Sequence, residues 1–87
     1  MSNLDGESSM FLRNAQYQLD RARRTNDTRE LKNIKFELNS IDDSLNKVYD
    51  KLEGQKRYDE MNASYEVQKL VRKMEAEVTN ILSKSYG

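Results

Sequence analysis

The stretch from residue 31 to residue 52 constrains the fold of this chain more than any other. Seven apolar residues follow one another there at spacings of three and four: Leu31, Ile34, Leu38, Ile41, Leu45, Val48 and Leu52. Leucine occupies every a position of the heptads, and a β-branched residue occupies every d position. On a helix these side chains form one narrow apolar seam, which other helices have to cover. The sequence therefore predicts a helical bundle with coiled-coil-like packing.

The composition is typical of long helices around a small core. The chain has 87 residues with no proline and no cysteine, and its 15 basic residues balance its 15 acidic ones. A domain of this size has a marginal core, and without cysteine or histidine it has neither disulfides nor zinc to stabilise it. Regular helix packing or oligomerisation has to supply the stability. With no net charge, the whole molecule offers no strong field to nucleic acid or a membrane surface.

The periodicity divides the chain into a tail and three helices. We expect a disordered acidic tail at residues 1–7, followed by one domain at 8–85. Within that domain, helices are expected at about residues 8–25, 28–53 and 56–84.

Two sets of cap-forming residues mark the ends of the middle helix. Asn26, Asp27 and Thr28 precede it, and Asp27 with Glu30 has the spacing of a capping box. Gly54 stands where a left-handed C-terminal cap belongs. Both junctions are therefore expected to be short turns between helices.

The expected fold class is all-α, a small antiparallel bundle of three helices. Three helices with short connections most simply fold up-down-up. The narrow seam of the middle helix keeps an alternative open, because a helix with two neighbours normally has a wider apolar face. In that alternative, the second and third helices form a long hairpin that pairs with another copy.

The third helix carries two apolar stripes that are out of phase. The downstream stripe consists of Val67, Val71, Met74, Val78 and Ile81, and the upstream stripe consists of Tyr58, Met61 and Tyr65. The offset is one residue, about 100° around a helix. A continuous helix cannot turn both stripes fully toward its neighbours, so we expect the upstream one to be partly exposed. Alternatively, residues 55–62 form a connection rather than helix.

The residue types argue against catalysis. The chain has no histidine or cysteine to act as a general base or a strong nucleophile. Its three glycines stand alone, so no phosphate-binding loop is present, and its carboxylates lack the spacing of a calcium loop. We expect a protein that is not an enzyme, with no cofactor and no metal site.

Six basic residues are expected to converge where the first and second helices join: Arg21, Arg23, Arg24, Arg29, Lys32 and Lys35. This basic pole is a candidate contact for phosphate or an acidic partner. The alternative is that these side chains complement a helix dipole and keep the surface soluble. Glu75 and Glu77 are expected at the same end, where they would neutralise part of the charge. No aromatic residues interleave with the basic ones, as they would on a platform for single-stranded nucleic acid.

Four residues are candidates for binding a partner protein: Tyr58, Met61, Tyr65 and Phe36. Tyrosine and methionine are enriched in binding surfaces, although the upstream stripe would serve equally well to cover the end of the core. Phe36 lies about 200° around the helix from Ile34, away from the seam. It is either an anchor for a partner or an ordinary exposed aromatic residue.

The function expected from these features is that of a non-enzymatic protein–protein interaction module. It would act as an adaptor, assembly factor or regulator through amphipathic helix faces, with a protein partner, self-association or both. The alternative is a small nucleic-acid-binding regulator that uses the basic pole. No family-specific motif is recognisable in these residues. No targeting segment or membrane-spanning apolar run is visible, so we expect a cytoplasmic protein.

Overall fold

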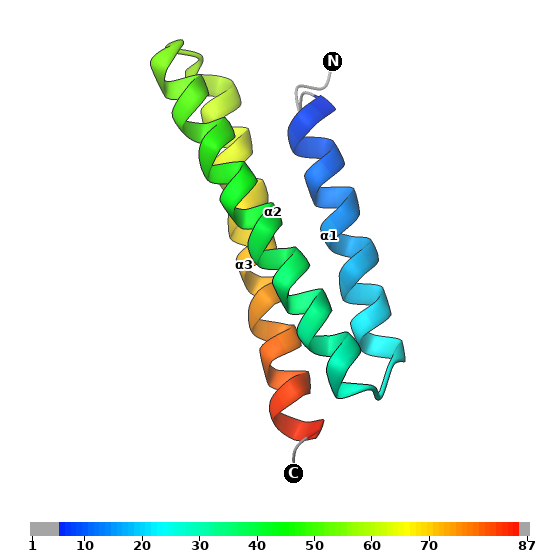
Figure 1. Cartoon of the computed structure of the whole chain (residues 1–87). Coiled ribbons are helices and arrows are strands. Elements are labelled where there is room, and N and C mark those ends of the chain that lie inside the picture. The colour runs from blue at the N-terminus through cyan, green and yellow to red at the C-terminus, as the bar shows by residue number, and fades with distance from the viewer. Residues whose placement is uncertain (1–5, 86–87) are drawn as a thin grey trace.

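The computed structural model describes residues 6–85, with side chains from residue 8 to residue 84, and contains three helices (Figure 1). They are α1 (Gly6–Arg24), α2 (Thr28–Gly54) and α3 (Tyr58–Ser85). Each helix packs against both others in an up-down-up arrangement, and the described residues include no strand. The predicted all-α three-helix bundle is confirmed. Helix α1 begins at Gly6, inside the stretch expected to be a tail, and residues 1–5 lie outside the described residues.

The junction of α1 and α2 is closed by a network of caps. Asp27 accepts a hydrogen bond of 3.0 Å from the backbone N–H of Arg29 and is the N-cap of α2, as expected. The capping box is not completed, because the Asp27 N–H donates to the hydroxyl of Thr25 at 3.1 Å. Glu30 instead accepts a hydrogen bond of 2.9 Å from that same hydroxyl. The cap therefore links the end of α1 to the start of α2.

The junction of α2 and α3 differs from the sequence prediction. Gly54 is the last residue of α2, and Lys56 adopts the left-handed conformation with φ of 59°. The N–H of Lys56 donates to the carbonyl of Glu53, and the N–H of Arg57 donates to the carbonyl of Leu52, both at 3.0 Å. These two bonds form a Schellman motif. The left-handed cap expected at Gly54 is therefore wrong by two residues.

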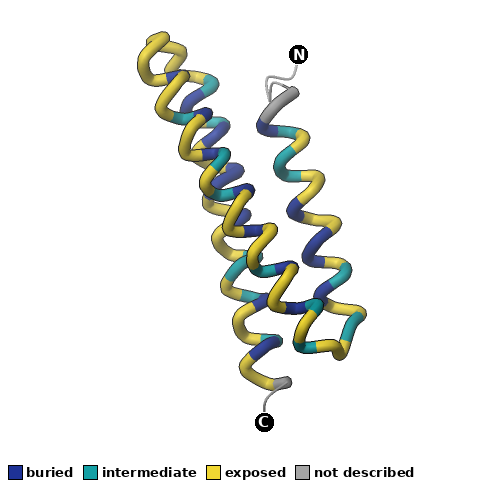
Figure 2. The backbone as a smooth tube through the Cα atoms, in the orientation of Figure 1, coloured by how far each residue is buried: buried dark blue, intermediate teal, exposed yellow. Residues whose placement is uncertain are grey.

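The core follows the seam of α2. All seven seam residues are buried. The first five, from Leu31 to Leu45, form one cluster with three residues of α1 and four of α3: Ala15, Leu19, Ala22, Val67, Val71, Val78 and Leu82. Figure 2 shows the buried positions facing inward along all three helices. A second cluster at the far end of the hairpin joins Val48, Leu52 and Met61. The hairpin of α2 and α3 extends beyond the first turn of α1 (Figure 1), so α1 does not lie beside its last turns.

Helix α3 is continuous from Tyr58, and only residues 55–57 form the connection. A single row at spacings of three and four runs through its whole length: Met61, Ser64, Gln68, Val71, Glu75, Val78 and Leu82. Three of these seven side chains are polar. Met61 therefore shares one row with Val71 and Val78, and Val67, Met74 and Ile81 form a row beside it. The two rows make the wide face that α3 needs to contact both α1 and α2.

Candidate functional site

Helix α2 has two opposite sides, and α1 covers one of them. On the covered side, Glu30 pairs with Arg21 of α1, and Ser44 lines a hollow with Phe11 of α1. Asp42 and Tyr49 lie on the other side and contact α3 instead. Residues seven apart share one side of a helix, so two matching rows meet along this edge of the hairpin. We call the two rows the open face: Lys35, Asp42 and Tyr49 of α2 with Tyr58, Tyr65, Arg72 and Thr79 of α3.

Aromatic side chains gather at the end of the open face nearest the α2–α3 connection. The rings of Tyr49 and Tyr65 lie 6.3 Å apart between centroids at an interplanar angle of 56°, a tilted arrangement. The ammonium group of Lys69 lies 5.2 Å from the centroid of the Tyr65 ring. Tyr58 is two turns before Tyr65 on the same row, and the two side chains are 58% and 46% exposed. This end of the open face is therefore an accessible tyrosine patch.

Met61 does not belong to this patch, although the sequence placed it there. It packs against Val48 and Leu52 in the core. The reason is the row that runs through Ser64 and Gln68, which points Met61 toward α2 and leaves the tyrosines on its flank. The upstream stripe therefore divides into a buried methionine and two exposed aromatic residues.

A hydrogen-bonded polar cluster lies next to the tyrosines, on the side away from the α2–α3 connection. The Gln68 side-chain amide donates to the carboxylate of Asp42 at 2.9 Å and to the side-chain oxygen of Asn46 at 2.7 Å. The Nε of Arg72 lies 3.4 Å from the same Asp42 oxygen. Gln68 is only 4% exposed, so both of its bonds form within the helix interface. The cluster ties α2 to α3 at one register.

Glu75 lies on the inward-facing row of α3, two turns after Gln68. Burial raises the pKa of Glu75, and the negative charges of Asp42 and Asp43 raise it further. Arg72 and Lys35 act in the opposite direction without cancelling the effect of burial. One carboxylate oxygen of Glu75 is buried and has no hydrogen-bond partner among residues 8–84. The fold therefore opposes the ionisation of Glu75.

Phe36 is separate from the tyrosine patch. Its side chain is 71% exposed and lies on the outer surface of α2. Thirteen residues separate it from Tyr49, which is about 20 Å along a helix. The structure therefore does not bring the four predicted partner-binding residues into one site.

Ion pairs occupy part of the basic pole. Arg21 pairs with Glu30 at 2.8 Å, and Arg23 makes two bonds to Glu77, at 2.8 and 3.1 Å. Hydrogen bonds from the arginines lower the pKa of both glutamates, and the pairing raises the pKa of Arg23. Glu77 therefore has the neutralising position expected of it. Arg24 donates to the backbone carbonyl of Asp20 at 3.3 Å and caps its own helix.

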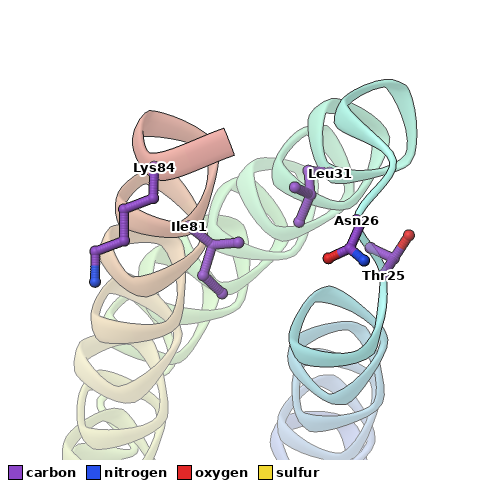
Figure 3. A pocket seen from close by; sticks show the side chains of 5 residues that line it. All are labelled: Thr25, Asn26, Leu31, Ile81 and Lys84. Carbon is purple, nitrogen blue, oxygen red and sulfur yellow. The ribbon is translucent and has the colours of Figure 1, made fainter. Parts of the chain in front are cut away.

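Two hollows lie beside the basic pole. The first, of about 360 Å³, lies between the α1–α2 connection and the last turns of α3 (Figure 3) and is lined by Thr25, Asn26, Leu31, Ile81 and Lys84. The second, of about 460 Å³, is lined by Lys32, Lys35, Thr79, Leu82 and Ser83. Neither contains a set of metal ligands, and no group of three acidic side chains that could hold a metal exists in the part of the chain that the structure describes.

Comparisons with protein families, curated proteins and solved structures find no match to this chain. Its function has to be inferred from its residues and their geometry. None of the three described helices is long and apolar enough to cross a membrane.

Sequence reasoning missed the polar side chains of the α2–α3 interface and the part played by Tyr49. Gln68, Ser64 and Glu75 are polar, so a pattern of apolar residues does not include them. The signal was nonetheless present, because the interval of three and four continues unbroken from Met61 to Leu82 when polarity is ignored.

Proposed function

We propose that this protein is a non-enzymatic interaction module that binds another protein through the open face of α2 and α3. The observation that carries the proposal is the tyrosine patch, in which Tyr49, Tyr58 and Tyr65 gather at one edge of the hairpin. Tyrosine is enriched at protein interfaces because it offers a large, rigid contact area and a polar tip.

The surroundings of the patch support binding rather than mere exposure. The Tyr49 and Tyr65 rings rest against each other, and Tyr49 also packs on the cluster of Val48, Leu52 and Met61. Side chains held in place by their neighbours lose little freedom on binding, which favours affinity. Arg72, beside the tyrosines, has a side chain that is 54% exposed and can donate hydrogen bonds that orient a partner helix.

The nucleic-acid alternative has less support. Arg21 and Arg23 form ion pairs with Glu30 and Glu77. The positive charge of two of the six basic residues is therefore partly neutralised. Phosphate binding depends on uncompensated positive charge. The protein-interaction proposal therefore ranks first.

A site-specific crosslinking experiment tests the proposal. A photoreactive phenylalanine analogue is placed at Tyr58 of the full chain and, as a matched control, at Tyr17 of α1, which is 59% exposed against 58% for Tyr58. We expect a discrete crosslinked complex from position 58 in the native host and none from position 17. With the analogue kept at position 58, Tyr65→Ser should strongly reduce that complex while leaving thermal unfolding nearly unchanged, because Tyr65 is exposed. Equal crosslinking from both positions, or none from position 58, contradicts the proposal.

A further inference from the structure

Another hollow lies on the side of α2 that α1 covers, away from the open face. It has a volume of about 270 Å³ and is lined by Phe11 of α1 and by Ser44, Lys47, Val48 and Lys51 of α2. Phe11 is half-buried and packs against both clusters of the core, and Val48 belongs to one of them. The apolar wall of the hollow is therefore held in place before anything binds, which favours the docking of an apolar side chain.

The rim of this hollow is basic. Lys47 and Lys51 lie one turn apart on α2, and both are exposed. No acidic side chain of residues 8–84 forms an ion pair with either of them, although Asp43 and Asp50 lie within one turn of Lys47 on the same helix. Two like charges at this spacing repel each other and destabilise the helix. Carboxylates of a ligand placed on the two ammonium groups would relieve that repulsion.

We propose that this hollow binds an acidic segment of a partner protein. One apolar side chain of the segment packs against the apolar wall, and its carboxylates pair with Lys47 and Lys51. Ser44 and Asp42 are two residues apart and therefore lie on opposite sides of α2, so this surface is distinct from the open face. The inference goes beyond the proposed function and does not depend on it.

The position of the hollow favours a chain segment over an isolated anion. Lys51 lies in the last turn of α2, and the hairpin extends beyond the first turn of α1 (Figure 1). A bound segment can therefore continue along α2 past the end of α1. Asp43 and Asp50 on the same stretch of helix oppose an extended polyanion such as nucleic acid. A peptide can instead place one or two carboxylates on the lysines alone.

Selection from a displayed library of random peptides tests the proposal. The purified full chain is the bait, and a peptide is kept only if it binds wild type and does not bind Ser44→Phe, whose larger side chain fills the hollow. Thermal unfolding checks that this variant is folded. If it is not, the double variant Lys47→Glu with Lys51→Glu replaces it, since both positions are exposed. We expect the kept peptides to combine an aromatic residue or leucine with aspartate or glutamate.

Charge reversal then gives a quantitative result. Fluorescence anisotropy measures the dissociation constant of a labelled kept peptide. Lys47→Glu with Lys51→Glu should weaken binding by about tenfold or more, because two attractions become repulsions. The matched control is Lys73→Glu with Lys84→Glu, which changes the net charge equally at exposed positions of α3 and should leave binding nearly unchanged. A peptide whose acidic residues are replaced by lysine should bind the reversed variant and not wild type.

Three results would overturn the inference. They are a selection that yields no peptide, kept peptides without acidic residues, and binding that charge reversal does not weaken. A short single-stranded oligonucleotide that binds wild type more tightly than the peptides at physiological salt, and depends on Lys47 and Lys51, would also overturn it and assign the hollow to nucleic acid. Crosslinking from Tyr58 reports on the open face, so each of the two proposals can fail without the other.

Discussion

The side-chain amide of Gln68 in α3 donates a hydrogen bond of 2.9 Å to the carboxylate of Asp42 in α2. Gln68 lies between Ser64 and Val71 on the inward-facing row of α3, and it is buried. A buried polar group is costly unless it is paired, so sliding α3 along α2 by one turn would leave both partners unsatisfied. The contact therefore selects the register of the hairpin, and the register in turn brings Tyr65 beside Tyr49.

Replacing Gln68 tests this contact. We expect Gln68→Ala to destabilise the protein by about 1–3 kcal/mol, because Asp42 and Asn46 lose a buried donor. The double substitution with Asp42→Ala should show a coupling energy of at least about 0.5 kcal/mol in denaturant unfolding. Gln16→Ala, at an exposed position of α1, is the control and should have little effect. Strict additivity of the two substitutions would show that the contact is energetically irrelevant.

The seam of α2 should dominate the stability. Leu38 and Leu45 are both completely buried, so replacing either by alanine should cost about 2–5 kcal/mol of unfolding free energy. The matched control is Leu70→Ala, because Leu70 is 43% exposed and loses far less contact. Thermal or denaturant unfolding measures the difference. A loss at Leu45 no larger than that at Leu70 would mean that the seam is not the core.

Replacing Gly54 at the end of α2 should stabilise the protein rather than destabilise it. Gly54 is helical, and a Cβ added there would meet nothing within 4 Å. Gly54→Ala should therefore stabilise the protein by about 0.5–1 kcal/mol, since alanine restricts the unfolded chain and favours helix. If Gly54 were the left-handed cap that the sequence suggested, the same substitution would destabilise. Lys56→Gly should also stabilise, because Lys56 has φ of 59°.

The raised pKa of Glu75 makes stability depend on pH. The native protein holds this proton more tightly than the unfolded chain does. The stability due to Glu75 is therefore fully present below the ordinary glutamate pKa, and it falls as the pH rises through the raised native pKa. We expect Glu75→Gln to raise the melting temperature at pH 7 and to have little effect below about pH 4.

The exposed Glu37→Gln is the control for Glu75 and should show no such dependence. A Glu75→Gln variant that melts lower than wild type at pH 7 would show that pairing with Arg72 and Lys35 outweighs burial. Glu30 and Glu77 act in the opposite sense, because their pKa values are lowered by Arg21 and Arg23. Their contribution is present above the ordinary glutamate pKa and is lost as the pH falls through their native pKa values.

Much of the fold followed from local patterns. The seam from Leu31 to Leu52 predicted a buried helix face because an unbroken apolar row leaves a helix no other stable arrangement. Asp27 predicted the start of α2 because an N-cap is made by residues adjacent in the chain. The prediction of a left-handed cap at Gly54 was wrong because α2 continues through Gly54 and ends in a Schellman motif. The left-handed residue of that motif is Lys56, at a position that glycine usually occupies.

The partner-binding prediction was harder because it depends on which side of α3 faces α2. Tyr58 and Tyr65 are exposed, and Met61 is buried, although the three share one stripe in the sequence. The side of α3 that faces α2 includes Gln68 and Ser64. The sequence pattern assigns these polar residues to the surface, but the fold buries them in the interface. Phe36 lies apart from the tyrosines because its position on α2 is about 20 Å away along the axis.

The sequence by itself determined three helices, their approximate ends and the buried face of α2, since each depends on residues a few positions apart. Only the tertiary structure decided the register of α3 on α2 and the pairing of Tyr49 with Tyr65. It also decided that Glu77 neutralises Arg23, which lies 54 positions away along the chain. These contacts join distant segments, and their geometry is fixed when the helices pack. Burial energy selects which face turns inward, and paired polar groups select the alignment.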